Sequence, residues 1–141
     1  MGAAGAGEIL VVNRSTAAAE RSVALAGPAG RLAVADELAD VDLVVNATPL
    51  GMGVVVTTDG APEPLPVDVE RLSPGQLVVD LVYHPAVTPF LAAARARGIH
   101  AVNGVGMLVN QAAHAFRLWT GEDPPREAMS AAVVAGLVHE D

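Results

Sequence analysis

The 141-residue sequence contains no cysteine and no lysine, and each absence excludes a class of chemistry. Without cysteine, the chain has no disulfide, no thiolate metal site and no cysteine nucleophile. Without lysine, it has no lysine general base, no Schiff base and no P-loop lysine. Its cations are eight arginines against sixteen acidic residues, and the formal net charge of −8 argues against a broad nucleic-acid surface.

Aromatic residues make up only 3% of the chain, although 52% of its residues are hydrophobic. The core must therefore consist of Val, Leu, Ala and Ile, which is typical of a parallel sheet covered by helices. The four histidines lack the close spacing of metal ligands, so we predict no metal site. Neither a signal peptide nor a membrane-length apolar run is present, so we expect a cytoplasmic protein.

Short β-branched runs alternate with helical segments along the whole chain. Strands are predicted at 8–13, 31–34, 42–46, 76–82 and 99–103, and helices at 16–25, 89–97, 107–119 and towards 138. The segment 53–74 is rich in Pro, Gly and acid and indicates a loop with one helical turn at 67–72. This alternation predicts an α/β fold, a Rossmann-like doubly wound parallel sheet, as a single domain over residues 1–141.

Two glycine-rich stretches differ from a dinucleotide-binding loop. Gly2–Gly7 is spaced G-x-x-G-x-G and precedes a strand, whereas the fingerprint follows a strand and leads into a helix. Gly104-Val-Gly106 does lie between a strand and a helix, but Val109 stands where the third glycine belongs. A pyrophosphate loop is therefore the less favoured interpretation of both.

Asn13-Arg14-Ser15 directly follows the first predicted strand. In a Rossmann sheet, an arginine at this place suits a 2′-phosphate, whereas an acid suits the ribose of NAD. The tripeptide therefore predicts NADP rather than NAD. A capped helix start with a solvated arginine is the alternative, and the residues alone leave both open.

Met107 and Gln111 are four residues apart on a predicted helix and share one face, with Gly104 at the helix entrance. An amide on an otherwise apolar helix needs a hydrogen-bond partner. Either a ligand hydroxyl or a backbone group could be the hydrogen-bond partner of the Gln111 amide.

Five ordered motifs resemble the NADP-binding domain of the shikimate dehydrogenase family. They are Asn13-Arg14-Ser15, Asn-Ala-Thr-Pro-Leu-Gly-Met at 46–52, Asp-Leu-Val-Tyr-His-Pro at 80–85 with Thr88, Asn-Gly-x-x-Met-Leu-Val-x-Gln at 103–111, and Phe-x-Leu-Trp-Thr-Gly at 116–121 followed by two prolines at 124–125. The resemblance runs from about Glu8 to the last helix. It implies the NADPH-dependent reduction of 3-dehydroshikimate to shikimate, on the chorismate route to aromatic amino acids.

The resemblance also implies roles for particular residues. The adenosine 2′-phosphate would be held by Asn13, Arg14 and Ser15. The nicotinamide half of the cofactor would be lined by Thr48, Leu81, Gly104 and Met107. The substrate would be contacted by Tyr83 and Gln111, and Asp80 would orient the loop that carries Tyr83.

The sequence departs from the family pattern at several places. Ala18 stands where the family has a second basic residue, for which Arg21 could substitute, and His84 replaces a usual asparagine. The family's first Rossmann strand, its glycine-rich phosphate loop and the following helix would precede Glu8, so we expect an N-terminally truncated domain. Gly2–Gly7 would be the end of that missing connection.

A missing first strand has a topological consequence, because that strand is central in the order 3-2-1-4-5-6. Its loss should separate the strand pair beginning at Glu8 from the sheet that contains Asn46, Asp80 and Asn103. We likewise expect the chain to lack the family's substrate domain, with its catalytic lysine and aspartate. We therefore assign no catalytic residue and expect no turnover by this chain alone.

Two other functions remain open. The chain could be a non-catalytic fragment that associates through open strand edges with an N-terminal substrate-domain partner or with a second copy. It could also belong to an enzyme of the quinate dehydrogenase type, since the residues that choose the substrate lie largely outside it.

Overall fold

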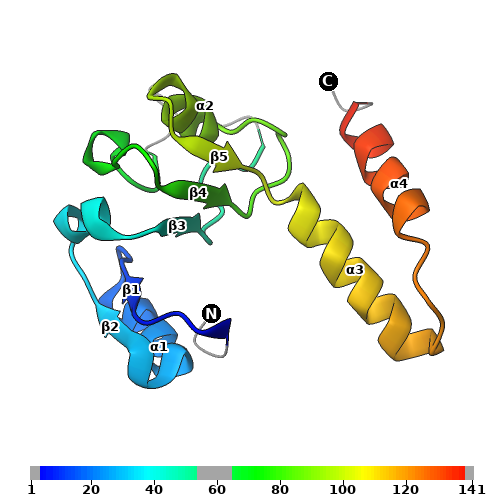
Figure 1. The fold of residues 1–141 in the computed structure, drawn as a ribbon, viewed down its shortest axis with the longest axis horizontal. Helices are drawn as coiled ribbons and strands as arrows, with labels where there is room; N and C mark the ends of the chain where they lie inside the picture. The colour runs from blue at the N-terminus through cyan, green and yellow to red at the C-terminus, as the bar shows by residue number, and fades with distance from the viewer. Residues whose placement is uncertain (1–3, 54–64, 139–141) are drawn as a thin grey trace. The chain divides into compact units, whose positions relative to one another are not determined.

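The structure is a computed structural model that describes residues 4–53 and 65–138 (Figure 1). It divides into two compact units, Met1–Asp40 and Val41–Asp141. The first unit carries the predicted 2′-phosphate residues, and the second carries all the other predicted site residues. A single domain over 1–141 stays a prediction.

The first unit is a short β-α-β motif. Strand β1 (Ile9–Val11) is followed by helix α1 (Thr16–Ala26), a 3-10 turn (Gly27–Ala29), strand β2 (Gly30–Leu32) and a 3-10 helix (Ala35–Asp40). The two strands pair in parallel, with Ile9 opposite Gly30. Among the described residues of this unit, few hydrophobic side chains are buried, namely Ala19 and Leu38.

The second unit contains a three-stranded parallel sheet in the order β3-β4-β5. Its elements are β3 (Leu43–Asn46), a 3-10 turn (Val69–Arg71), β4 (Leu77–Asp80), α2 (Pro89–Ala96), β5 (His100–Val102), α3 (Val105–Thr120) and α4 (Arg126–Val138). Asn46 is paired with Asp80, and Val79 with Val102. The carboxyl ends of the three strands therefore lie at one edge.

The core of the second unit lies between α2 and the strands β4 and β5. Phe90, Leu91 and Ala94 of α2 and Val78 of β4 are at most 1% exposed. Helix α2 starts where Thr88 caps it, because the Thr88 hydroxyl accepts a hydrogen bond from the Leu91 N–H. Burial of this small apolar set fixes the helix against the sheet.

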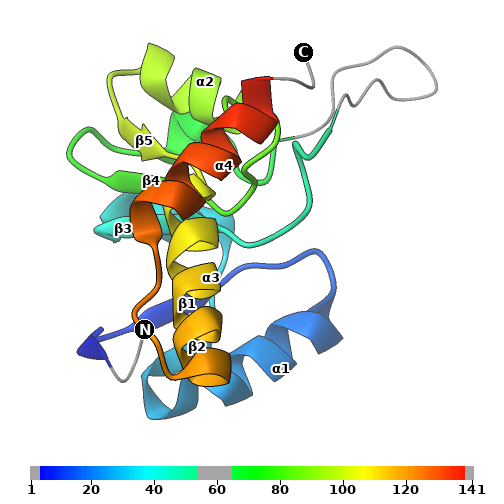
Figure 2. The same ribbon diagram turned by 90° about the vertical axis from the view of Figure 1, so that its right-hand side faces the viewer.

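Helices α3 and α4 form a hairpin (Figure 1) and contact each other, and Figure 2 shows the same pair from the side. Helix α3 ends at Gly121, whose φ of 76° lies in the left-handed region that favours glycine. Ala113 is the buried residue of α3, and Trp119 is 84% exposed. Within the described residues, no helix is both long enough and apolar enough to span a membrane.

The sequence predicted this architecture well. The predicted strands and long helices are present with ends shifted by a few residues, and the mixed α/β fold with parallel sheets is confirmed. The strands also fall into the expected pair and trio. The 3-10 helix Ala35–Asp40 was not predicted, and residues 54–64 of the predicted loop lie outside the described residues. The missing family strand stays a prediction.

Candidate functional site

The chain leaves β1 through a turn held by its own polar side chains. Asn13 Oδ1 accepts a hydrogen bond from the Ser15 N–H at 2.9 Å. Ser15 caps α1, and its Oγ accepts from the Ala18 N–H at 3.4 Å. Arg14 lies between them, exposed and with no hydrogen bond or ion pair to the rest of the described chain. Its guanidinium is therefore free for a ligand at the positive end of α1.

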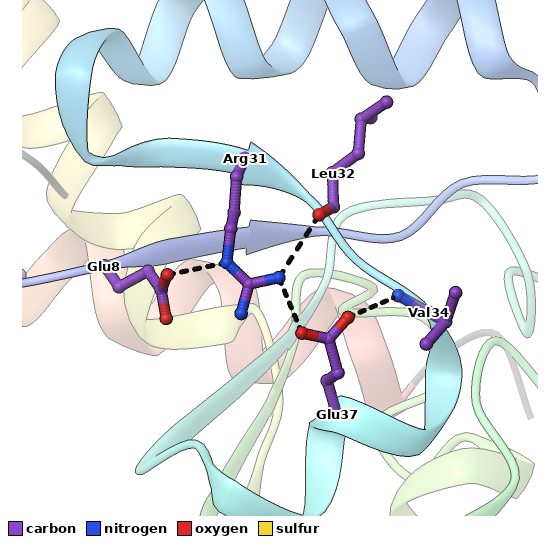
Figure 3. Close-up of polar contacts among 5 residues, drawn as sticks. All are labelled: Glu8, Arg31, Leu32, Val34 and Glu37. Atoms are coloured by element: carbon purple, nitrogen blue, oxygen red, sulfur yellow. Dashed lines mark hydrogen bonds and ion pairs between the residues drawn. The ribbon is translucent and has the colours of Figure 1, made fainter.

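Arg31, in the same unit, differs from Arg14 because its guanidinium is ion-paired within the protein (Figure 3). Its guanidinium donates to Glu8 and to Glu37, each at 2.6 Å. The pKa of Arg31 is raised, first by the hydrogen bond to Glu8 and then by the one to Glu37. The Val34 N–H and Arg31 together lower the pKa of the Glu37 carboxyl.

The arginines of the chain divide clearly by this criterion. All eight lie in the described residues, and six of them are hydrogen-bonded or ion-paired to other protein groups. The two without such a contact there are Arg14 and Arg21. Both belong to the first unit, so the cations available to an anionic ligand are concentrated around α1.

In the second unit, the loop after β3 is organised by Asn46. The Thr48 N–H and the Thr48 hydroxyl both donate to Asn46 Oδ1, at 3.0 Å and 2.7 Å. The Leu50 N–H in turn donates to Thr48 Oγ1 at 3.3 Å. Thr48 is half-buried, and this set of bonds fixes its position at the carboxyl end of the strand.

The buried carboxyl group of Asp80 joins this loop to the neighbouring one. Its Oδ1 accepts hydrogen bonds from Asn46 Nδ2 at 2.9 Å and from the Val82 N–H at 3.1 Å. Its Oδ2 accepts from the Thr88 hydroxyl at 2.6 Å. The bond to Val82 holds the start of the loop that carries Tyr83, which is the role expected of Asp80.

Gly104 lies against the backbone at the end of β4. Its N–H donates to the Val82 carbonyl at 3.1 Å, and a Cβ on this residue would lie 2.1 Å from the Leu81 carbonyl oxygen. Glycine is therefore needed for close packing of the β5–α3 turn. The Leu81 N–H donates to the Asn46 carbonyl, so the loops after all three strands are joined. Sequence reasoning missed this packing role of Gly104.

The predicted substrate residues Tyr83 and Gln111, and Met107 of the predicted nicotinamide half, are accessible. Tyr83 and Met107 are each 41% exposed, and Gln111 is exposed too. In the described parts of the chain, Gln111 and the Tyr83 hydroxyl make no hydrogen bond to protein groups. The pocket of about 210 Å³ beside Tyr83 is also lined by His84, Leu108 and one face of α4, whereas Met107 and Gln111 do not line it. The structure thus does not bring Tyr83 and Gln111 into one pocket.

Metal binding finds no support in the part of the chain that the structure describes. No group of three or more His, Asp or Glu side chains is close enough there to hold an ion.

A family model and a curated relative match this sequence. The model described as "Shikimate 5'-dehydrogenase C-terminal domain" matches residues 104–134. The chain is 44% identical over 136 residues to a shikimate dehydrogenase (NADP(+)) of Acidiphilium cryptum. That alignment covers 92% of this chain and 46% of the relative.

Solved structures match the fold. The chain is similar to shikimate 5-dehydrogenase of Thermus thermophilus in complex with NADP(H) and shikimate, with 33% identity and a TM-score of 0.78. This match covers 94% of this chain and 47% of that one. The quinate dehydrogenase of Corynebacterium glutamicum in complex with NAD is similar at 31% identity and a TM-score of 0.79, over 93% and 47% of the two chains.

The sequence matches and the structure matches agree in extent, because each covers most of this chain and about half of the matched protein. The chain spans less than half the length of the curated relatives that it matches. The resemblance inferred from the five motifs is confirmed. The chain is homologous to the C-terminal part of shikimate dehydrogenases over nearly its whole length.

Proposed function

We propose that this chain is the NADP-binding part of an oxidoreductase that interconverts 3-dehydroshikimate and shikimate in the synthesis of chorismate and aromatic amino acids. The names of the curated relatives, and the relative solved with NADP(H) and shikimate, support this function. When bound, NADPH supplies the hydride. The residues of this chain bind the cofactor and orient it towards the substrate.

The adenosine 2′-phosphate binds at the start of α1 in this proposal. The observation that carries it is the free guanidinium of Arg14, flanked by Asn13 and Ser15 and located at the positive end of a helix. Guanidinium groups bind phosphate through paired, charge-assisted hydrogen bonds. The other unpaired arginine, Arg21, is the candidate for a second contact.

The nicotinamide half of the cofactor lies against the second unit. Thr48, Leu81 and Gly104 follow three adjacent parallel strands, and ligands of such sheets bind at the carboxyl ends of the strands. Met107, on the first turn of α3, completes this surface. Tyr83 and Gln111 contact the substrate.

Proton transfer requires groups beyond this chain. Reduction of a ketone needs a proton donor for the developing alkoxide as well as a bound hydride source. The sequence has no lysine, and the family's substrate domain would supply the lysine and aspartate. We therefore expect cofactor binding, without turnover, from the isolated chain.

The 2′-phosphate assignment is tested by calorimetric titration of the parent chain and the Arg14→Ala variant with NADP⁺. Loss of a charge-assisted contact should weaken binding by about tenfold to a hundredfold. Arg71→Ala is the matched control, because Arg71 is exposed but ion-paired to Asp68. An Arg14→Ala variant that binds as tightly as the parent would refute the assignment.

A second candidate function is assembly with a partner chain, either an N-terminal substrate-domain partner or a second copy. Strands β1 and β3 are each paired on one side only within the described residues, and the first unit buries little apolar surface. A missing family strand would account for both features. Light scattering after mixing with a separately made substrate domain tests this function, and a mass that stays monomeric in every mixture counts against it.

The substrate could also be quinate, and the similarity to the C. glutamicum quinate dehydrogenase supports this alternative. The two substrates are distinguished by comparing the rates at which shikimate and quinate are oxidised by this chain mixed with a separately made substrate domain. A cytoplasmic location stays a prediction.

A further inference from the structure

The orientation of the buried Asn46 amide follows from its four hydrogen-bond partners. Its Oδ1 faces two donors of Thr48, the backbone N–H and the hydroxyl. Its Nδ2 faces two acceptors, Asp80 Oδ1 at 2.9 Å and the Leu50 carbonyl at 3.3 Å. A flipped amide would place its oxygen against a carboxylate and its nitrogen against an N–H. Only one orientation satisfies all four contacts.

This orientation determines where the Thr48 hydroxyl donates its hydrogen bond and where it can accept one. Asn46 Oδ1 is only an acceptor, so the Thr48 hydroxyl must use its single proton in the 2.7 Å contact. One of its two lone pairs accepts from the Leu50 N–H. The remaining lone pair is the hydrogen-bonding capacity that Thr48 Oγ1 still has for a ligand. Thr48 is thus an acceptor, and not a donor, towards anything bound beside it.

The second carboxylate oxygen of Asp80 connects the Asn46–Thr48 hydrogen bonds to the core. Asp80 Oδ2 accepts from the Thr88 hydroxyl, and Thr88 also caps α2, so the carboxylate is tied to a helix of the core. Asn46, Asp80 and Thr88 are all at most 3% exposed. Gly51, at the end of the Thr48 loop, lies so close to Thr88 that an added Cβ would be 3.3 Å from its Cβ. The loop is therefore supported from two directions.

We propose that Asp80 and Asn46 are positioning residues that hold Thr48 as a pure hydrogen-bond acceptor, and that Thr48 accepts from the carboxamide NH₂ of the bound nicotinamide. The inference rests on the proposed function, because it deepens the assignment of Thr48 to the nicotinamide half of the site. The nicotinamide ring carries one hydrogen-bond donor group, its carboxamide nitrogen. An acceptor-only hydroxyl is complementary to that group.

The test compares NADP⁺ with its 3-acetylpyridine analogue, in which a methyl ketone replaces the carboxamide. The analogue keeps the carbonyl oxygen and loses the N–H donors. The parent chain should bind NADP⁺ roughly threefold to tenfold more tightly than the analogue, as expected for one neutral hydrogen bond. Thr48→Val, which keeps the shape but not the hydroxyl, should bind the two nucleotides equally.

A matched control is Thr120→Val, because the Thr120 hydroxyl bonds to the Phe116 carbonyl at the other end of α3. This variant should keep the preference of the parent. If Thr48→Val retains the preference, or the parent shows none, the inference is overturned while the proposed function stands. If the parent binds neither nucleotide, the proposed function fails and the ligand assignment fails with it.

The positioning role is tested by exchanging the two partners. Asn46→Asp alone places two carboxylates 2.9 Å apart, and it should abolish the preference for NADP⁺ or prevent folding. In the double variant with Asp80→Asn, the new amide donates to the new carboxylate, which still accepts both Thr48 donors, whereas the Val82 N–H and the Leu50 carbonyl lose their partners. Compared with Asn46→Asp alone, the double variant should therefore regain the nucleotide preference and part of the lost stability. A folded double variant without the preference would overturn the positioning role.

Discussion

The Thr88 hydroxyl donates a 2.6 Å hydrogen bond to the buried carboxylate of Asp80 and accepts one from the Leu91 N–H. One side chain thus stabilises a buried charge and caps a core helix. The two contacts connect the end of β4 with the start of α2, and they hold together the edge of the sheet where the nicotinamide residues are proposed to lie.

We predict that Thr88→Val destabilises the second unit by about 2–4 kcal/mol, because it removes a helix cap and a donor to a buried carboxylate. Thr88→Ser keeps both hydrogen bonds and should recover most of this loss. Urea unfolding, followed by circular dichroism, measures both variants. Equal stability of the valine and serine variants would show that the hydroxyl does not matter.

We predict opposite effects for two glycines at the start of α3. Gly104→Ala should destabilise the fold by at least about 2 kcal/mol, because its Cβ would lie 2.1 Å from the Leu81 carbonyl oxygen. Gly106→Ala, with nothing within 4 Å of its Cβ, should stabilise α3 by up to about 1 kcal/mol. Thermal melts measure both variants. Melting temperatures that shift in the same direction in the two variants would contradict the close packing at Gly104.

We predict that the contribution of Glu37 to the stability of the first unit depends on pH. The pKa of Glu37 is lowered by the Val34 N–H and by Arg31, so its stabilisation is full above the unfolded-state pKa. It is lost as the pH falls through the lower folded-state pKa. Glu37→Gln should therefore lower the melting temperature at neutral pH and have little effect in acid. A difference that persists in acid would rule out the carboxylate as its cause.

Much of this architecture could be predicted from the sequence, because the strands are β-branched runs and Thr88-Pro89 marks a helix start. The 3-10 helix at Ala35–Asp40 was missed, because its six residues are too few for a periodic apolar pattern. The Asn46–Asp80 contact joins residues 34 apart and depends on strand register, which the sequence does not specify. The ligand role of Gly104 stays a prediction, and its close approach to the Leu81 backbone was not predicted, because it depends on how the β5–α3 turn packs against the end of β4.

The central claim is that this chain binds NADP through the residues that follow β1. The most direct measurement is a calorimetric titration of the folded parent chain with NADP⁺ and, separately, with NAD⁺. The account predicts micromolar binding of NADP⁺ and much weaker binding of NAD⁺, because Arg14 has no 2′-phosphate to contact in NAD⁺. Equal affinity for the two nucleotides, or no binding of either, would contradict it.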